Sequence, residues 1–440
     1  MISKQEYARR RKQLMDTMEP GSIAIIASAQ ELVRSRDTHF MFRQDSDFHY
    51  LSGFPEPNAV IALIPGREHG EFVLFCNDKD LEQETWHGRR FGPEAACDEF
   101  AADDAFPIDD IDDILPGMME GRHRIYYEMG KNNELDNRVM GWVNKIRAQV
   151  KKGAQPPGEF VDLRHALHEL RLFKSAAEIK LMRKSAAIAV DAHLRAMNVC
   201  QPGMTEWQIE AELHYEFARQ GARYPAYSSI VASGDNACIL HYTENQSKLK
   251  KEDLLLIDAG AEYQMYASDI TRTFPVSGVF SEPQKELYNL VLKAQLAAIE
   301  TIRPGSHWMQ AHETAVAVLT EGMVELGLLK GDVAQLIEEE AYKRFYMHKT
   351  GHWIGLDVHD VGDYSIEGQP RVLEAGMVMT VEPAIYIPAN ADDVAAKYRG
   401  IGIRIEDDVL VTASGHDILT DGVPKTIEEI EAIMAQQKAA

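Results

Sequence analysis

Two aspartates stand where a β-like run would otherwise continue into a hydrophobic core. The segment "LLLIDAGAEYQMYASDITRTF", residues 254–274, ends an apolar run on Asp258 and returns to a second carboxylate at Asp269. An ionised carboxylate in a dry interior costs several kcal/mol unless a partner offsets that cost. The pattern therefore indicates that positive charge accompanies these two acids.

A second pair of β-like runs carries two more acids. One apolar run ends on Glu382, and another contains Glu406. In an unbulged antiparallel hairpin we expect Asp258 directly opposite Asp269, with both side chains on one face. Alternation along the last run places Glu406 and Arg404 on a common face. A lone strand acid is usually solvated or paired with a nearby base, but four acids in two paired runs predict one shared polar site.

A histidine-rich segment supplies further donors. The stretch "HKTGHWIGLDVHDVGDY", residues 348–364, contains His348, His352 and His359 beside three glycines. It is not the H-E-x-x-H helix of zinc peptidases, and by itself it is compatible with a surface turn. One imidazole with four carboxylates is an oxygen-dominated set that suits manganese, with cobalt, iron or zinc as competitors. Two divalent ions balance four carboxylates, and Arg404 balances a bridging hydroxide.

Such a site has an obvious chemistry. Two divalent ions about 3.5 to 4 Å apart hold a hydroxide at neutral pH and polarise a carbonyl oxygen, a common arrangement for the hydrolysis of an amide. Nucleophilic alternatives lack support, because the chain has no G-x-S-x-G elbow and none of its four cysteines stands in a nucleophile motif. No Walker or G-x-G-x-x-G phosphate loop is present either.

Composition narrows the class of protein further. The formal net charge of −23 and the lack of a long basic run argue against a nucleic-acid or anionic-membrane partner. The first residues contain a basic cluster without an apolar segment behind it, and no later stretch approaches eighteen apolar residues. We therefore expect a cytoplasmic protein.

The elements that position these residues fall into two predicted domains, since 440 residues exceed one ordinary core. Residues 1–172 alternate short apolar runs with polar segments, which predicts an α/β domain. Residues 173–440 begin with a capping box, Ser175 and Glu178, that opens a long amphipathic helix. We expect two further long helices, at 205–221 and 282–302.

The order of five residues resembles a known family, the dinuclear metallopeptidases of the pita-bread fold, which include methionine aminopeptidase, prolidase and aminopeptidase P. The matching segments are "GHWIGLDVHD", "VEPAIY" and "GIRIEDDV", and the five residues are Asp258, Asp269, His352, Glu382 and Glu406. Two segments of the amino-terminal half, "RQDSDFHYLSGFPEPNAV" and "TWHGRRFG", resemble the accessory domain of bacterial aminopeptidase P. The resemblance implies an α/β amino-terminal domain, 1–172, and an α+β pita-bread catalytic domain, 173–440.

The resemblance also implies a role for each ligand. Asp258 is expected to bind one metal ion, Asp269 and Glu406 to bridge two, and His352 and Glu382 to complete the other. Glu382 is further expected to accept the proton of the attacking water.

Other residues are matched to the substrate cleft by the same resemblance. His241, His348 and His359 are expected to line it, with His359 stabilising the developing oxyanion and His241 also contributing to catalysis. Tyr364 and Arg404 match positions that orient ligands or the leaving group. By sequence alone, His241 is equally compatible with a core or surface histidine.

The predicted activity is that of an aminopeptidase that removes the residue before a penultimate proline through a metal-bridging hydroxide. The X-Pro bond is a tertiary amide without an N–H, so a protease that binds its substrate through a hydrogen bond from that N–H cannot bind it in the same way. An Xaa-Pro dipeptidase, or prolidase, shares all five ligands and is the alternative within the enzyme class. A metal-free pita-bread peptide-binding module is a third possibility, which the presence of all five ligands disfavours.

Trp86, in "ETWHGRRFG", is predicted to lie on an exposed loop. Its side chain is expected to pack either on its own domain or against substrate. We expect it to help close the proline end of the cleft, either in its own chain or in a neighbouring subunit. The expected assembly is a homo-oligomer, a dimer or tetramer.

Overall fold

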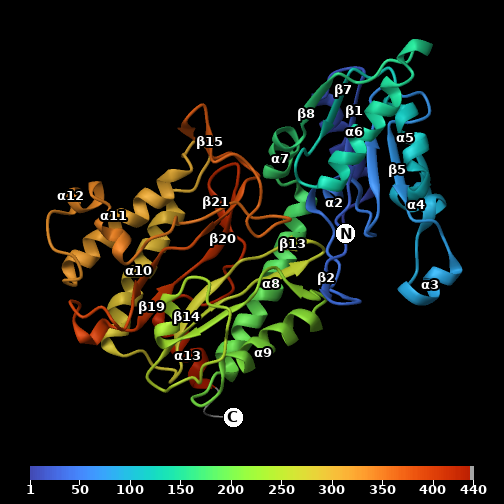
Figure 1. Ribbon diagram of the computed structural model, residues 1–440. Helices are drawn as coiled ribbons and strands as arrows, with labels where there is room; N and C mark the ends of the chain where they lie inside the picture. Colours follow the sequence, from blue (N-terminus) through green and yellow to red (C-terminus); the bar gives the residue numbers. More distant parts are fainter. Residues whose placement is uncertain (437–440) are drawn as a thin grey trace. The chain divides into compact units, whose positions relative to one another are not determined.

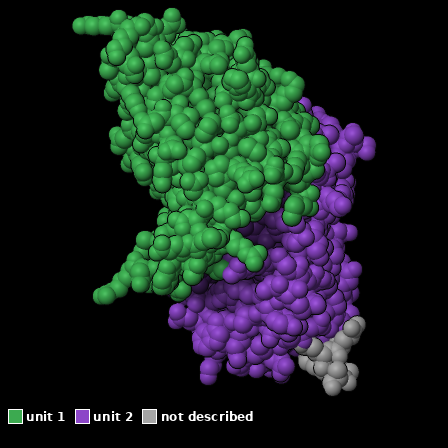
Figure 2. All heavy atoms as spheres, turned by 90° about the vertical axis from the view of Figure 1, so that its right-hand side faces the viewer, with its two compact units in different colours: residues 1–171 green, residues 172–440 purple. Residues whose placement is uncertain are grey.

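Ser175 and Glu178 form the expected capping box in the computed structural model, which describes residues 1–436. Ser175 Oγ accepts the Glu178 N–H at 3.4 Å, and the Glu178 carboxylate accepts the Ser175 N–H at 2.9 Å. The chain divides close to this point into two compact units, Met1–Arg171 and Leu172–Ala440, which Figure 2 colours separately. The domain boundary between residues 172 and 173 stays a prediction.

Unit 1 is built on one six-stranded sheet of order β6-β5-β4-β1-β7-β8. β1, β7 and β8 run parallel, whereas β4 is antiparallel to both β1 and β5. The strands are β1 (Ser22–Ala27), β4 (Val60–Leu63), β5 (Phe72–Cys76), β6 (Asp104–Pro107), β7 (Arg124–Tyr127) and β8 (Glu159–Asp162), and a small hairpin joins β2 (Val33–Ser35) and β3 (Thr38–His39). The short apolar runs of the sequence, "SIAIIA", "VIAL", "FVLFC" and "RIYY", form β1, β4, β5 and β7. The expectation missed β6 and β8, which are half-buried and lack an apolar run.

Helices of unit 1 cover the sheet, as Figure 1 shows in blue and teal. The helices of unit 1 are α1 (Lys4–Thr17), α2 (Ser46–Ser52), α3 (Leu81–His87), α4 (Gly92–Phe100), α5 (Ile111–Met119), α6 (Asn133–Arg147) and α7 (Arg164–Leu172), of which α3 has no buried residue and lies apart from the sheet. Leu115 of α5 and Val139 and Trp142 of α6 are buried in one core with Ile25 and Val73 of the sheet. This is the α/β arrangement expected for the amino-terminal half.

Unit 2 combines several small sheets with long helices. Its strands are β9 (Tyr224–Pro225), β10 (Ile230–Ser233), β11 (Leu254–Asp258), β12 (Ala261–Tyr263), β13 (Tyr266–Ala267), β14 (Thr271–Pro275), β15 (Ser365–Ile366), β16 (Gln369–Pro370), β17 (Val378–Val381), β18 (Ala384–Ile387), β19 (Ile401–Arg404), β20 (Asp407–Val411) and β21 (His416–Ile418). Its helices are α8 (Ala176–Val199), α9 (Glu206–Arg219), α10 (Glu282–Glu300), α11 (Met309–Glu325), α12 (Val333–Glu338) and α13 (Ile427–Gln436). The three long helices predicted from sequence correspond to α8, α9 and α10.

In Figure 1 the strands of unit 2 lie between the helix pair α8/α9 and the helix pair α10/α11. One apolar core joins both pairs to the strands, with Ile188 and Leu213 from the first pair, Val291 and Leu319 from the second, and Ile257 from β11. The apolar faces of the strands are buried in this core. The opposite, polar faces therefore remain available to form a site. Within residues 1–436, no helix is long and apolar enough to span a membrane.

The register of the first acid-bearing hairpin differs from the expectation. Asp258 pairs with Thr271 rather than with Asp269, and Asp269 precedes β14. The reason is the turn, because Gln264 and Met265 both adopt positive φ, 50° and 73°, as a two-residue hairpin turn requires. Turn position fixes register, so Asp269 lies diagonal to Asp258 on the same face.

The second acid-bearing hairpin brings its two acids face to face. Val381 pairs with Asp407 and Ala384 pairs with Arg404, so the same antiparallel register runs through the break between β17 and β18. Glu382 and Glu406 occupy facing positions in that break. Glu382 directly follows the last residue of β17 and Glu406 directly precedes the first residue of β20, so both acids lie at strand ends.

Candidate metal centre

A cavity of about 450 Å³ in unit 2 collects residues from all these strand ends. Its wall contains Tyr227, Ser228, Ile230, Leu240, His241, Thr243, Asp258, Asp269, His348, Lys349, Gly351, His352, Val358, His359, Glu382, Arg404 and Glu406. All five predicted metal ligands are therefore brought together, although they span some 150 residues of sequence. His241, His348, His359 and Arg404 line the same space.

The donor atoms converge closely. One donor atom each from Asp269, His352 and Glu406 lies within 4.8 Å of the others. His352 Nε2 is 3.4 Å from an oxygen of Asp269 and 3.6 Å from an oxygen of Glu382. One donor atom from each of these residues is thus near enough to the others for a common cation to bind between them.

His352 is held in the tautomer that a metal ligand needs. Its Nδ1 lies 3.0 Å from the carbonyl oxygen of Trp353, to which it donates, so Nε2 is the nitrogen that faces the carboxylates. Burial opposes charge on this ring, but the carboxylates of Asp269 and Glu382 raise the pKa of His352 to about 9. These two carboxylates therefore favour positive charge at the position of the His352 ring.

Threonine hydroxyl groups donate hydrogen bonds to two of the carboxylates. Thr271 donates to Glu406 at 2.6 Å, and Thr380 donates to Glu382 at 3.2 Å while accepting the backbone N–H of His352 at 3.0 Å. Each hydroxyl leaves other carboxylate oxygens directed at the cavity.

Tyr227 is a site residue that the sequence reasoning missed. Its hydroxyl lies 2.6 Å from Asp258 and 2.5 Å from Asp269, and so bridges the two acids of the first hairpin. Burial and the neighbouring carboxylates raise the pKa of Tyr227 well above its ordinary value, so it is a neutral donor. It lies in "YPAYSSI", where nothing in the spacing distinguishes it from a core tyrosine.

Arg404 uses all three guanidinium nitrogens. They donate to Asp258 at 2.6 Å, to the Tyr386 hydroxyl at 2.7 Å and to the Thr271 hydroxyl at 3.2 Å. The Tyr386 hydroxyl in turn lies 3.0 Å from His348 Nε2. Arg404 therefore orients a ligand and, through Tyr386, a cleft histidine.

The electrostatics of the site call for cations. Burial and mutual repulsion raise the pKa of Glu406 well above its ordinary range, and burial raises the pKa of Glu382 to about 7. Burial likewise raises the pKa of Asp258. Among the lysines and arginines of residues 1–436, only Arg404 forms an ion pair with one of these four acids, so divalent ions fit both the donor chemistry and the charge.

The histidine segment is held against β17 by a close backbone approach. A Cβ on Gly351 would lie 2.0 Å from the carbonyl oxygen of Thr380, so this position admits only glycine. Further along, a buried ion pair of 2.9 Å joins Lys174 to Asp360, next to His359. The ring of His359 packs edge-on to that of His352, with centroids 4.2 Å apart.

Two predicted site residues lie away from the cavity wall. The Tyr364 hydroxyl accepts the Trp353 N–H at 3.1 Å, and its ring stacks on Trp353, so it supports the residue beside His352. Trp86 belongs to unit 1 and is 77% exposed. The loop expected around it is instead the helix α3, which Asp80 caps by accepting the N–H groups of Glu82 and Gln83.

A buried network lies behind the acid-bearing strands. The guanidinium of Arg272 donates to Asp407 at 2.8 Å and to the Glu406 carbonyl oxygen at 2.6 Å. Lys425 Nζ and Gln295 Nε2 contact the second oxygen of Asp407 at 2.9 and 2.7 Å. The network ties β14 to β20, the strands beside Asp269 and Glu406.

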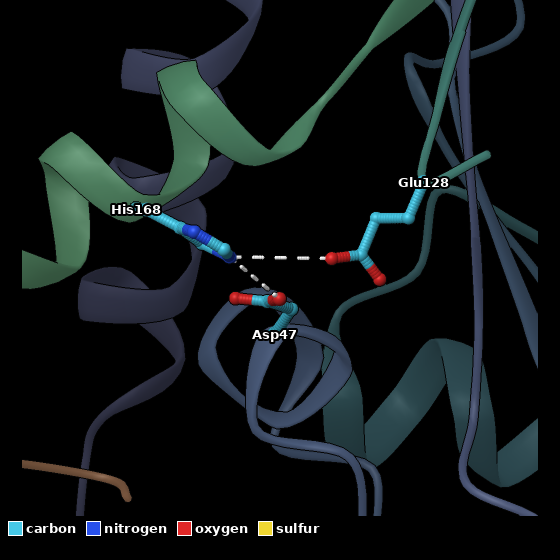
Figure 3. Close-up of side chains that lie close together, drawn as sticks. All are labelled: Asp47, Glu128 and His168. Carbon is cyan, nitrogen blue, oxygen red and sulfur yellow. Dashed lines mark hydrogen bonds and ion pairs between the residues drawn. The ribbon is translucent and has the colours of Figure 1, made fainter. Parts of the chain in front are cut away.

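Unit 1 contains a second cluster of potential ligands, Asp47, Glu128 and His168, whose side chains point toward one another in Figure 3. His168 Nε2 lies 3.3 Å from Asp47 and 4.0 Å from Glu128. Arg171 pairs with Asp47 at 2.7 Å, and Lys131 pairs with Glu128. The two acids are thus already neutralised by side chains, unlike the four acids of unit 2.

This cluster predicts a pH-dependent stability. Burial and the charge of Asp47 raise the pKa of Glu128 from 4.5 to about 7, against the opposing charge of Lys131. A carboxyl whose pKa is raised by folding stabilises the fold below its unfolded pKa and loses that contribution as pH rises through 7. Glu128→Gln should therefore become more stable relative to the wild type between about pH 5 and about pH 8, by on the order of 2 kcal/mol.

Urea unfolding of both proteins at the two pH values measures this change. The charged and titratable groups that act on Glu128 are Asp47, Lys131 and His168, and none is altered in the variant. A stability difference that does not change with pH would contradict the assignment.

Comparison with known proteins places this geometry in a family. The model of "Metallopeptidase family M24" matches residues 180–413, and the model of "Aminopeptidase P, N-terminal domain" matches residues 7–126. The Xaa-Pro aminopeptidase of Escherichia coli is 46% identical over 434 residues, 98% of each chain. The chain belongs to metallopeptidase family M24. Both units thus have counterparts in one kind of metallopeptidase.

Solved structures agree with this membership. The structure of aminopeptidase PepP from Pseudomonas aeruginosa matches with a TM-score of 0.99 at 60% identity, covering 100% of this chain and 99% of that one. Zinc-substituted Escherichia coli aminopeptidase P in complex with product matches with a TM-score of 0.97 at 46% identity, covering 99% of each chain. The expected fold class, an α/β amino-terminal domain followed by an α+β pita-bread domain, is confirmed.

Proposed function

We infer that the protein is a metallo-aminopeptidase that hydrolyses the bond between an amino-terminal residue and a penultimate proline. The observation that carries this inference is the convergence of four carboxylates and one imidazole on a single cavity of a chain whose relatives are Xaa-Pro aminopeptidases. Its alternative within the enzyme class, the prolidase, is disfavoured by the same relatives. The non-catalytic binding module is disfavoured because every expected ligand is present in the cavity.

Two divalent cations are the proposed cofactors, and manganese is the proposed metal. We assign Asp258, Asp269, His352, Glu382 and Glu406 as the residues that hold them, with Asp269 and Glu406 shared between the two. Divalent cations bound there supply Lewis acidity toward the scissile carbonyl and lower the pKa of water. A set of four carboxylates and one imidazole suits manganese better than a thiolate-loving metal.

The protein's own groups account for the remaining steps. Glu382 is assigned as the proton acceptor, because its carboxylate lies in the cavity wall and Thr380 fixes one of its oxygens. His359 and His241 line the cavity and are assigned to the substrate carbonyl. His348 is neutral, since burial lowers its pKa to about 4, so it is assigned to binding rather than to proton transfer.

A substrate series tests the activity directly. With manganese added, we expect the purified protein to cleave Xaa-Pro-Xaa tripeptides and longer chains, with Xaa-Pro dipeptides clearly poorer and Met-Ala-type peptides poorest. The expected order follows from an open cleft that does not require a carboxylate next to the proline. Dipeptide turnover equal to tripeptide turnover would favour the prolidase assignment instead.

Several further expectations accompany this proposal. We propose a cytoplasmic location and a homo-oligomer, and both stay predictions. The assignment of Trp86 to the proline end of the substrate also stays a prediction. An increase in KM of Trp86→Ala for Xaa-Pro substrates, with unchanged metal content, is the expected outcome of that assignment.

A further inference from the structure

Lys349 is the one lysine in the wall of the active-site cavity. Across residues 1–436 its ammonium group has no ion pair or hydrogen bond, whereas the guanidinium of Arg404 in the same wall is fully engaged. Glu340, whose charge interacts with that of Lys349, is itself paired with Lys343. The cavity therefore carries one uncommitted positive charge on its wall.

The backbone that carries Lys349 is held on both sides. His348 Nδ1 donates to the carbonyl oxygen of Lys349 at 2.8 Å, and the Glu382 N–H donates to the carbonyl oxygen of Thr350 at 2.7 Å. The Thr350 hydroxyl is also 2.8 Å from His312 Nδ1. The backbone at Lys349 is therefore fixed, and the reach of its side chain sets the region in which the ammonium group can meet a ligand.

The charge of Lys349 does not stabilise the four acids of the cavity through an ion pair. Asp258, Asp269, Glu382 and Glu406 are matched by Arg404 and the proposed divalent cations, and Lys349 forms no ion pair with any of them. A compact, hydrated ammonium suits an ion pair with a mobile carboxylate better than a buried structural pair. A substrate carboxylate is the anion that an aminopeptidase cleft meets.

We propose that Lys349 is a specificity residue that binds a carboxylate of the peptide substrate. This inference rests on the proposed aminopeptidase function. The carboxylate comes from one of two sources, an acidic side chain on the first residue or the carboxyl terminus of a tripeptide. Because the ammonium is exposed to solvent, the pair is worth no more than about three- to tenfold in KM and weakens as salt rises.

Two pairs of tripeptides distinguish the sources. Ala-Pro-Ala is compared with its carboxyl-terminal amide, and Glu-Pro-Ala amide is compared with Gln-Pro-Ala amide. In the wild-type protein, one pair shows a kcat/KM ratio about three- to tenfold in favour of the carboxylate. Lys349→Met brings that ratio close to one, and Lys349→Arg retains it.

Lys343→Met is the matched control, because it removes the same charge from a nearby exposed lysine outside the cavity wall. It keeps the wild-type ratios. Equal ratios in the wild type and Lys349→Met for both pairs overturn the assignment of Lys349. A wild-type protein that cleaves none of the four peptides overturns the proposed aminopeptidase function, and the two failures are thereby distinguished.

Discussion

Asp269→Asn and Glu406→Gln each lower the rate of Xaa-Pro-Xaa hydrolysis by roughly a thousandfold or more, while the fold survives. Each change keeps the shape of the side chain and removes one negative charge from the centre of the proposed metal site. With one bridging charge lost, two divalent cations repel each other with less compensation, so metal occupancy falls below that of the wild type. Kinetics and metal analysis of the purified variants measure both effects.

Glu374→Gln provides the control for these variants. It makes the same chemical change on an exposed residue of unit 2 and should retain both activity and metal content. Circular dichroism of all three variants separates loss of fold from loss of metal. Full activity in either Asp269→Asn or Glu406→Gln would show that the four acids do not form the metal site.

Arg272→Met lowers the free energy of unfolding by about 3–5 kcal/mol. Both Arg272 and Asp407 are fully buried, and the guanidinium also donates to the carbonyl oxygens of Thr271 and Glu406. Removing it leaves a buried carboxylate with only Lys425 as a charged partner and leaves backbone acceptors unsatisfied. Urea unfolding monitored by circular dichroism gives the difference.

A double variant tests whether the pair itself is responsible. Arg272→Met with Asp407→Leu removes both charges and should be more stable than Arg272→Met alone, because a buried pair is often replaceable by apolar groups. Lys397→Met breaks the exposed Lys397–Glu286 pair and should cost less than about 1 kcal/mol. A cost that small for Arg272→Met would contradict the role given to the network.

The residues that meet in the cavity were easier to predict from the sequence than the strand register that places them there. Asp258, Asp269, Glu382 and Glu406 were predicted to share one polar site because a buried charge without a partner is so unfavourable, and the structure places all four in one cavity wall. Register was not predictable from alternation, because a shift that keeps the same face leaves the polar pattern unchanged. The turn at residues 264–265 decided it.

The roles of residues that depend on contacts distant in the sequence could not be predicted from the sequence. Tyr227 looks like a core tyrosine until its hydroxyl is seen between two carboxylates. The partner of Arg272, Asp407, lies 135 residues away in the sequence, so no local pattern indicates their ion pair. The helix around Trp86 had a local signal, since Asp80 is an N-cap residue followed by acidic residues in the first turn.

Unit 2 is proposed to hold two metal ions among the side chains of Asp258, Asp269, His352, Glu382 and Glu406. The most direct measurement is the anomalous difference density of crystals grown with manganese and recorded near its absorption edge. The expected result is two peaks in the cavity, both within coordination distance of Asp269 and Glu406, with Asp258 beside one and His352 and Glu382 beside the other. A cavity without peaks, or a manganese peak only at Asp47, Glu128 and His168 of unit 1, would contradict it.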